Sequence, residues 1–423
     1  MNKRLFDNIG EVLYSEVLEN GLGVHVVPKA GFKKSYAFFA ANYGGADRRF
    51  RLGGKVINTP AGVAHFLEHK MFDTADGGNA LNVLSSNGAS PNAYTSSSMT
   101  AYFFESTEGF YENLETLLSF VSVPYFTKES VQKEQGIIGQ EIRMVEDSPG
   151  NSVYYNLMKC LFAENPVRDS VAGTVESIAE ITHETLYDCH KVFYNPSNMV
   201  LCVVGDVNPM LVADTARRIL PKSAGELPFR DYGKGEGVLP FTSRVQVEME
   251  VSAPLFIIGS KFVPDSENRL RQELIAGLSL DCLLGESSPF YTGLYKEGIL
   301  NNMFGYEADY SAGAGMLFIE GESSEPERVL ERLNEEVLNI TEKGMSEEVF
   351  ARQKKAMFGG RIRGLGRFET LCRLLAEGHF AGFCQFDAFK ELETITLSEV
   401  CGYIKENLST ERLAMSVVSP KAR

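Results

Sequence analysis

Two histidines and a glutamate lie within five consecutive residues, HFLEH at 65–69. On a helix, residues four positions apart lie one above the other, so the imidazoles of His65 and His69 can reach one metal ion. Imidazole nitrogens are common zinc ligands, and Glu68 is placed to take a proton from a water that the ion activates. With six histidines and 56 acidic residues in 423 positions, chance would produce this spacing about 0.01 times per chain. The motif therefore predicts a catalytic zinc site rather than a buried helix with ordinary hydrogen-bonded histidines.

The residues before this motif favour a helix. Thr59 can cap the start of the helix, and Pro60 suits the first helical position, where its missing N–H is not needed. Residues 64–71 contain neither glycine nor proline. We therefore expect a helix that begins at Pro60 and carries both histidines on one side.

A second predicted helix supplies a candidate third ligand. A catalytic zinc ion needs three protein ligands and one open position. Residues 130–144 combine apolar positions at helical spacing with Glu134 and Glu141, which lie two turns apart on one face. Glu141 is the predicted ligand, and Glu134 would hydrogen-bond to the ligands or tune them through its charge. Glu146 is the alternative ligand, although it lies well around the helix from Glu134.

With these motifs in place, the sequence resembles the insulinase/pitrilysin family of zinc peptidases, the inverzincins, in which the order is H-x-x-E-H. Residues 91–95 (PNAYT) resemble the edge-strand motif of the family, and residues 194–199 (YNPSNM) and 203–206 (VVGD) resemble the signature that closes its catalytic domain. The chain length is most similar to the bacterial branch that resembles the mitochondrial processing peptidase. The roles implied by this resemblance are zinc ligands at His65, His69 and Glu141, a catalytic base at Glu68, an outer carboxylate at Glu134, and a substrate-binding edge strand at Asn92, Ala93 and Tyr94.

The resemblance implies a zinc-dependent endopeptidase. In such an enzyme, Glu68 takes the proton of the attacking water and delivers it to the leaving amine. The peptide substrate would bind extended, as an added strand along Asn92, Ala93 and Tyr94, with main-chain hydrogen bonds supplying affinity. The alternative for this segment is a plain strand-entry turn.

Composition limits the remaining possibilities. The length of 423 residues suggests at least two domains. A net charge of -15 argues against nucleic-acid binding, and it either attracts basic peptides weakly or serves solubility alone. No apolar run is long enough to span a membrane. Seven scattered cysteines and the absence of a secretory signal predict reduced thiols and a cytoplasmic location.

The order of expected elements repeats in the second half of the chain. Residues 256–262 parallel the early strand at 36–43, residues 271–284 take the place of the HFLEH helix, and 347–362 parallel the helix of Glu141. The mixture of strands and helices without strict alternation predicts an α+β fold of two homologous sandwich domains, each a mostly antiparallel sheet with helices packed on one face.

The domain boundaries follow from composition. We expect a zinc-binding catalytic domain at 1–221, a glycine-rich linker at 222–243, and a homologous non-catalytic domain at 244–423. The second copy lacks the metal chemistry, because residues 271–284 contain no histidine and Gly360 falls where Glu141 would be expected.

One departure from the family bears on partners. The family places an arginine and, seven residues later, a tyrosine in a non-zinc module, where they help to bind substrate. Here Tyr295 and Asn302 occupy those positions. We therefore expect a homo- or heterodimer in which a paralogous subunit supplies the arginine and tyrosine and this chain is the zinc subunit of a two-subunit clamp. The alternative is a catalytically silent scaffold or core subunit, although the ligands and base are all present here.

Overall fold

Two β-sheets with nearly the same strand order form the framework of the chain. The structure is a computed structural model that describes residues 1–222 and 225–421. It divides into two compact units. The first unit comprises residues 1–142, 170–231 and 362–386, and the second comprises 143–169, 232–361 and 387–423.

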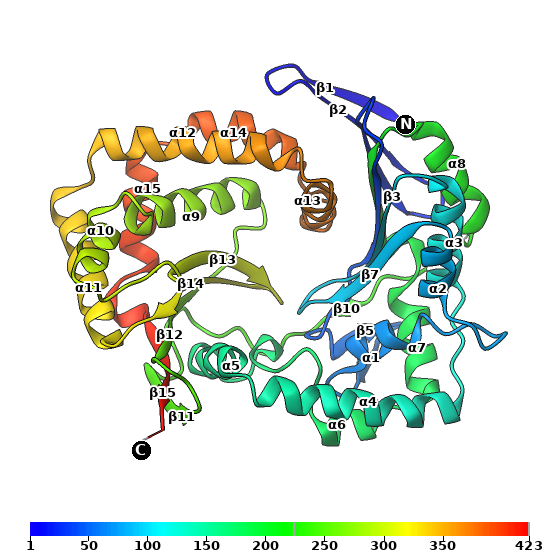
Figure 1. Ribbon diagram of the computed structural model, residues 1–423, viewed down its shortest axis with the longest axis horizontal. Helices are drawn as coiled ribbons and strands as arrows, with labels where there is room; N and C mark the ends of the chain where they lie inside the picture. The colour runs from blue at the N-terminus through cyan, green and yellow to red at the C-terminus, as the bar shows by residue number, and fades with distance from the viewer. Residues whose placement is uncertain (223–224, 422–423) are drawn as a thin grey trace. The chain divides into compact units, whose positions relative to one another are not determined.

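The sheet of the first unit has the strand order β1-β2-β3-β9-β4-β8-β7. Its strands β1, β2, β3 and β7 are labelled in Figure 1. All neighbouring strands run antiparallel except β3 and β9, which are parallel. Strand β7 lies at one end of this order. The strands are β1 (Asn2–Phe6), β2 (Glu11–Val17), β3 (Gly23–Pro28), β4 (Ser35–Ala41), β7 (Ala89–Thr95), β8 (Thr100–Ser106) and β9 (Met199–Gly205). A small separate sheet has the order β10-β5-β6 and consists of β5 (Arg49–Leu52), β6 (Lys55–Asn58) and β10 (Phe229–Arg230).

The sheet of the second unit repeats the core of the first. Its order is β11-β15-β12-β14-β13, and its single parallel pair, β11 with β15, stands where β3 and β9 stand in the first sheet. Chain order agrees as well, since the last strand of each sheet is inserted between two strands that follow one another in the chain, β9 between β3 and β4, and β15 between β11 and β12. The predicted α+β class with two homologous, mostly antiparallel modules is confirmed. The strands are β11 (Arg244–Met249), β12 (Leu255–Phe262), β13 (Gly305–Ser311), β14 (Ala314–Glu322) and β15 (Ala414–Pro420).

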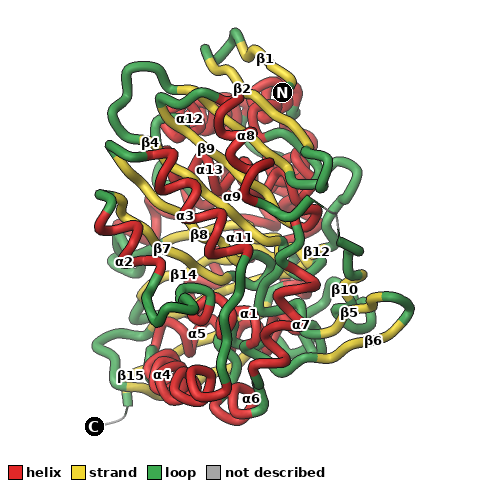
Figure 2. Tube along the Cα trace, turned by 90° about the vertical axis from the view of Figure 1, so that its right-hand side faces the viewer, coloured by secondary structure: helices red, strands yellow, loops and turns green. Residues whose placement is uncertain are grey.

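Helices cover both faces of the first sheet, whereas the sequence predicts helices on one face only. Helices α3 and α8 pack on one face together with α1, and Figure 2 looks onto this face. Helix α13 packs on β4 and β9 from the opposite side (Figure 1). This explains why every residue of β4 and β9 is buried. The helices of this unit are α1 (Val63–Lys70), α2 (Ala80–Ser86), α3 (Phe110–Ser122), α6 (Val175–Ala179), α7 (His183–Phe193), α8 (Pro209–Ile219) and α13 (Phe368–Ala381), together with most of α4 (Lys128–Glu146).

The two units exchange one helix each. Helix α5, from the first half of the chain, packs on β12 and β15 of the second unit, whereas α13, from the second half, belongs to the first unit. The contiguous division at 1–221, 222–243 and 244–423 stays a prediction, and its residues 223–224 and 422–423 lie outside the described part of the chain. The helices of the second unit are α5 (Pro149–Leu161), α9 (Arg269–Leu284), α10 (Pro289–Lys296), α11 (Pro326–Lys343), α14 (Ala388–Thr394) and α15 (Leu397–Asn407), with nearly all of α12 (Glu347–Gly364).

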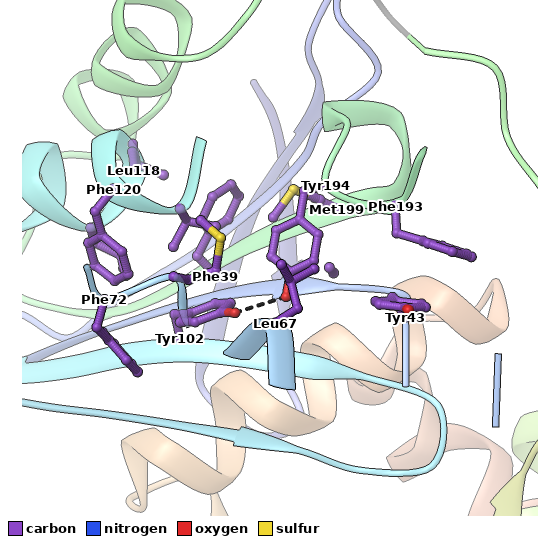
Figure 3. Close-up of a cluster of buried hydrophobic side chains, with 14 of the residues drawn as sticks. Phe39, Tyr43, Leu67, Phe72, Tyr102, Leu118, Phe120, Phe193, Tyr194 and Met199 are labelled. Atoms are coloured by element: carbon purple, nitrogen blue, oxygen red, sulfur yellow. Dashed lines mark hydrogen bonds between the residues drawn. The ribbon is translucent and has the colours of Figure 1, made fainter. Parts of the chain in front are cut away.

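The core of the first unit holds α1 in place. Leu67 of α1 is fully buried in the cluster that also contains Phe39 and Tyr102 from the sheet (Figure 3). At its centre the Tyr102 and Tyr194 hydroxyls are 2.8 Å apart and hydrogen-bonded. Because Phe66 and Leu67 face this core, the helix turns its histidines to the other side.

His190 on α7 makes the stability of the fold sensitive to acid. Its Nε2–H donates to the carbonyl oxygen of Val121 at 2.9 Å, and burial lowers its pKa to about 4, although this hydrogen bond opposes the shift. The unfolded chain, with a histidine pKa near 6.5, therefore binds the proton more readily. The contribution of neutral His190 to the free energy of unfolding is complete above about pH 6.5 and is lost as the pH falls toward about 4. By pH 5 the loss amounts to about 2 kcal/mol.

We expect His190→Gln, whose amide can keep the donor to Val121, to lose less stability than the wild type between pH 7 and pH 5. Urea unfolding of both proteins in chelator measures the difference. Equal losses in the two proteins would contradict the role of His190.

Two structural findings concern membrane spans and cysteines. Among the described residues, no helix has the length and apolar character that a bilayer span requires. All seven cysteines lie in the described part of the chain, and none of them forms a disulfide there.

Candidate metal centre

The helix that carries HFLEH starts later than the sequence predicts. Helix α1 begins at Val63, and its N-cap is Gly62 in the left-handed region, with φ of 92° and no side-chain cap. The predicted start at Thr59 and Pro60 is therefore wrong. A Cβ on residue 62 would lie 2.5 Å from the carbonyl oxygen of Ala172, so the sharp entry into the helix requires glycine.

Three side chains converge at one point. His65 Nε2 lies 3.5 Å from Oε1 of Glu141, and His69 Nε2 lies 3.6 Å from Oε2 of the same carboxylate. The three ligand atoms lie within 4.8 Å of one another. In a tetrahedral site with bonds of about 2.0–2.1 Å, ligand atoms lie roughly 3.3 Å apart. Two imidazoles and a carboxylate at this spacing fit zinc, and they leave a fourth position open.

Glu134 lies behind His69. Its Oε1 is 3.1 Å from His69 Nδ1, which is the distance of a hydrogen bond. With its proton on Nδ1, His69 presents the lone pair of Nε2 toward Glu141. A carboxylate that orients a histidine in this way is a common outer partner in metal sites.

Charge interactions favour the ionised carboxylates. Burial lowers the pKa of His69, but the hydrogen bond with Glu134 and the charges of Glu68 and Glu141 outweigh it, so the pKa is raised overall. The hydrogen bond with His69 lowers the pKa of Glu134, and the hydrogen bond with His65 lowers that of Glu141. Both carboxylates therefore stay in the anionic form that binds a cation.

Glu68 faces the edge strand of the sheet. It is only 8% exposed, and Oγ1 of Thr95 donates to its Oε2 at 2.6 Å. The sequence analysis predicts no role for Thr95. Its place at the end of the NAYT segment is the one feature of the sequence that points to it.

Strand β7 offers an open edge next to α1. Among the described residues it pairs only with β8, where Ala93 stands opposite Tyr102 and Tyr94 opposite Ala101. The hairpin is closed by a hydrogen bond from Ser96 N to Met99 O, and hydrogen-bonded pairs alternate from there. The main-chain groups of Ala93 therefore point away from β8.

The other two predicted residues of this strand differ in their surroundings. The exposed Asn92 accepts a hydrogen bond from the N–H of Ala93 through its own Oδ1 at 2.9 Å. The ring of Tyr94 packs against Phe38 and Phe103, on the face of the sheet that α13 covers. Of the three residues, Ala93 is thus the one whose backbone faces the open edge.

The remaining candidates lie elsewhere. Glu146 is exposed at the last position of α4 and takes no part in the ligand cluster. In the second unit, Tyr295 on α10 stacks on Tyr291, and Asn302 lies in the loop that follows α10.

Comparison with known proteins defines the class. The family model for insulinase (peptidase family M16) matches residues 55–175, and the model for the peptidase M16 inactive domain matches residues 180–357. The chain belongs to the insulinase/pitrilysin family of M16 peptidases.

Individual relatives are similar to this chain in sequence or fold along nearly its whole length. The uncharacterized zinc protease YmfH of Bacillus subtilis (strain 168) is 38% identical over 429 residues, covering 99% of each chain. A crystal structure of an M16-like peptidase from Alicyclobacillus acidocaldarius is 34% identical, with a TM-score of 0.92 over 97% of this chain and 99% of that one. Pitrilysin shares the fold, with a TM-score of 0.76 at 17% identity, over 99% of this chain and 46% of its own.

Proposed function

We propose that this chain is a zinc-dependent endopeptidase that cleaves extended peptides. The observation that carries the proposal is the convergence of His65, His69 and Glu141 on one point beside the buried Glu68. When bound there, zinc would supply Lewis-acid chemistry, polarising the substrate carbonyl and acidifying a water.

Glu68 is the proposed catalytic base. Its ionised carboxylate takes the proton of the attacking water and passes it to the nitrogen of the leaving amine. The hydroxyl of Thr95 holds one of its oxygens at 2.6 Å, so the other oxygen is left for the water. Glu134 keeps the ring of His69 in orientation through Nδ1.

Loss of the Thr95 hydroxyl should slow the reaction without weakening substrate binding. A hydrogen bond to a charged group contributes about 1.5–3 kcal/mol, and about 1.4 kcal/mol corresponds to a tenfold change in rate. We expect Thr95→Val to lower kcat about tenfold with KM unchanged, measured on a fluorogenic peptide. Thr107→Val, in an exposed loop, is the control, and a kcat equal to wild type for Thr95→Val would contradict the contact.

The peptide would pair with the free edge of β7. The outward main-chain groups of Ala93 support this, and Asn92 and Tyr94 flank the pairing position. Such pairing reads the main chain of the substrate more than its side chains, so varied sequences could be accepted.

The proposed working form is a two-subunit clamp. This chain has Tyr295 and Asn302 where the family has its arginine and tyrosine, and in fold it corresponds to less than half of the pitrilysin chain. A paralogous partner that carries the arginine and the tyrosine would complete the site, whereas a second copy of this chain has the same Tyr295 and Asn302. The seven cysteines form no disulfide in the described part of the chain, which fits a reducing compartment such as the cytoplasm.

A scaffold role is the second candidate. It is supported by the match of residues 180–357 to the M16 inactive domain. The test is to measure zinc stoichiometry and peptide cleavage for the purified chain, alone and with a paralogue that carries the arginine and tyrosine. One zinc per chain, with peptide cleavage by the chain alone or with the paralogue, supports the peptidase. Zinc binding with no cleavage in either sample supports the scaffold.

A further inference from the structure

Lys70, directly after the second histidine, is a buried cation beside the metal centre. Its side chain is 3% exposed. Its ammonium group is hydrogen-bonded to Asp73 and lies 3.9 Å from Oε2 of Glu134. Burying an ammonium group is costly unless carboxylates face it, and here two of them do.

The two oxygens of Glu134 are divided between consecutive residues of α1. Oε1 accepts the hydrogen bond from Nδ1 of His69, and Oε2 faces the ammonium of Lys70. Oε1 is fixed by a hydrogen bond, and Oε2 is attracted by an ammonium group at the distance of an ion pair, so this carboxylate is oriented more firmly than one with a single contact. Without Lys70, neither Glu134 nor Asp73 would have this cation beside it.

We propose that Lys70 is a positioning residue of the metal centre, which acts through Glu134 to fix the orientation of the His69 ring. This inference rests on the proposed zinc site. The competing explanation is a purely structural ion pair between Lys70 and Asp73, which would leave metal binding unchanged when it is removed.

A double-mutant cycle separates the two explanations. The zinc dissociation constant is measured by chelator competition for wild type, Lys70→Met, Glu134→Gln and the double variant. Replacing an outer partner of a metal ligand weakens metal affinity about 10- to 100-fold. We expect about tenfold weaker binding for Lys70→Met, a larger loss for Glu134→Gln, and no further loss in the double variant. Lys70→Arg, which keeps the cation, should stay within about threefold of wild type.

Lys133→Met is the matched control, because it removes an exposed lysine whose charge also acts on Glu134. We expect it to change affinity less than about twofold. Should Lys70→Met fail to fold, Lys70→Gln takes its place in the cycle.

Unchanged affinity in Lys70→Met, or additive losses in the double variant, would overturn the role of Lys70 while leaving the zinc site standing. Failure of the wild type to bind zinc would overturn the proposed function and the role of Lys70 together.

Discussion

Replacing Glu68 with glutamine should lower kcat for peptide hydrolysis by about 10³-fold, while the protein keeps one zinc per chain. General acid–base catalysis contributes about 10²- to 10⁴-fold, and Glu68 is the buried carboxylate next to the ligands that is not itself among them. Glutamine has nearly the same shape and can still accept the hydrogen bond from Thr95, so the fold and the ligand set should be retained. Steady-state kinetics and metal analysis of the same preparation give both quantities.

Glu108→Gln is a suitable control for this experiment. Glu108 is exposed in the loop before α3 and is not among the three clustered ligands. Full activity in Glu68→Gln with its zinc retained would show that another group is the base. Loss of zinc from Glu68→Gln would instead indicate that the residue belongs to the ligand set.

Replacing Glu141 with glutamine should remove both zinc and activity. Glu141 places one oxygen near each histidine, at 3.5 and 3.6 Å, and among the described residues no other histidine, cysteine, aspartate or glutamate forms a group of three with them. We expect zinc affinity to fall by more than about 100-fold, since even outer partners of ligands are worth about 10- to 100-fold. Chelator competition measures this loss, and peptide cleavage at limiting zinc should fall in proportion.

Glu146→Gln is the matched comparison on the same helix. Glu146 lies five residues further along α4, is exposed, and stands outside the cluster, so zinc affinity should stay within about twofold of wild type. Loss of zinc in Glu146→Gln together with retention in Glu141→Gln would reverse the assignment of the third ligand.

Much of the candidate site could be predicted because its patterns are local. The four-residue spacing of His65 and His69 and the seven-residue spacing of Glu134 and Glu141 depend only on helical geometry. Both pairs lie on one face of their helices in the structure. The strands β4 and β12 likewise follow from runs of apolar residues, and their observed bounds differ little from the expected 36–43 and 256–262.

Other features of the fold depend on contacts between residues far apart in the chain, which no local sequence pattern predicts. The start of α1 at Val63 follows from the close approach of Gly62 to Ala172, which is 110 residues away in the chain. Continuous burial of β4 indicates that both of its faces are covered. The covering helix α13, however, comes from the second half of the chain, and pairing across such a separation is decided by packing.

The sequence by itself determined which residues could do the chemistry: two imidazoles, a base and a pair of carboxylates whose types and spacings identify a zinc peptidase motif. Only the tertiary structure decided how these groups are held. The hydroxyl of Thr95 on Glu68 and the ammonium of Lys70 beside Glu134 depend on how closely β7 and α4 approach α1. Spacing along a helix is dictated by the backbone, whereas distances between elements are dictated by the core that packs them together.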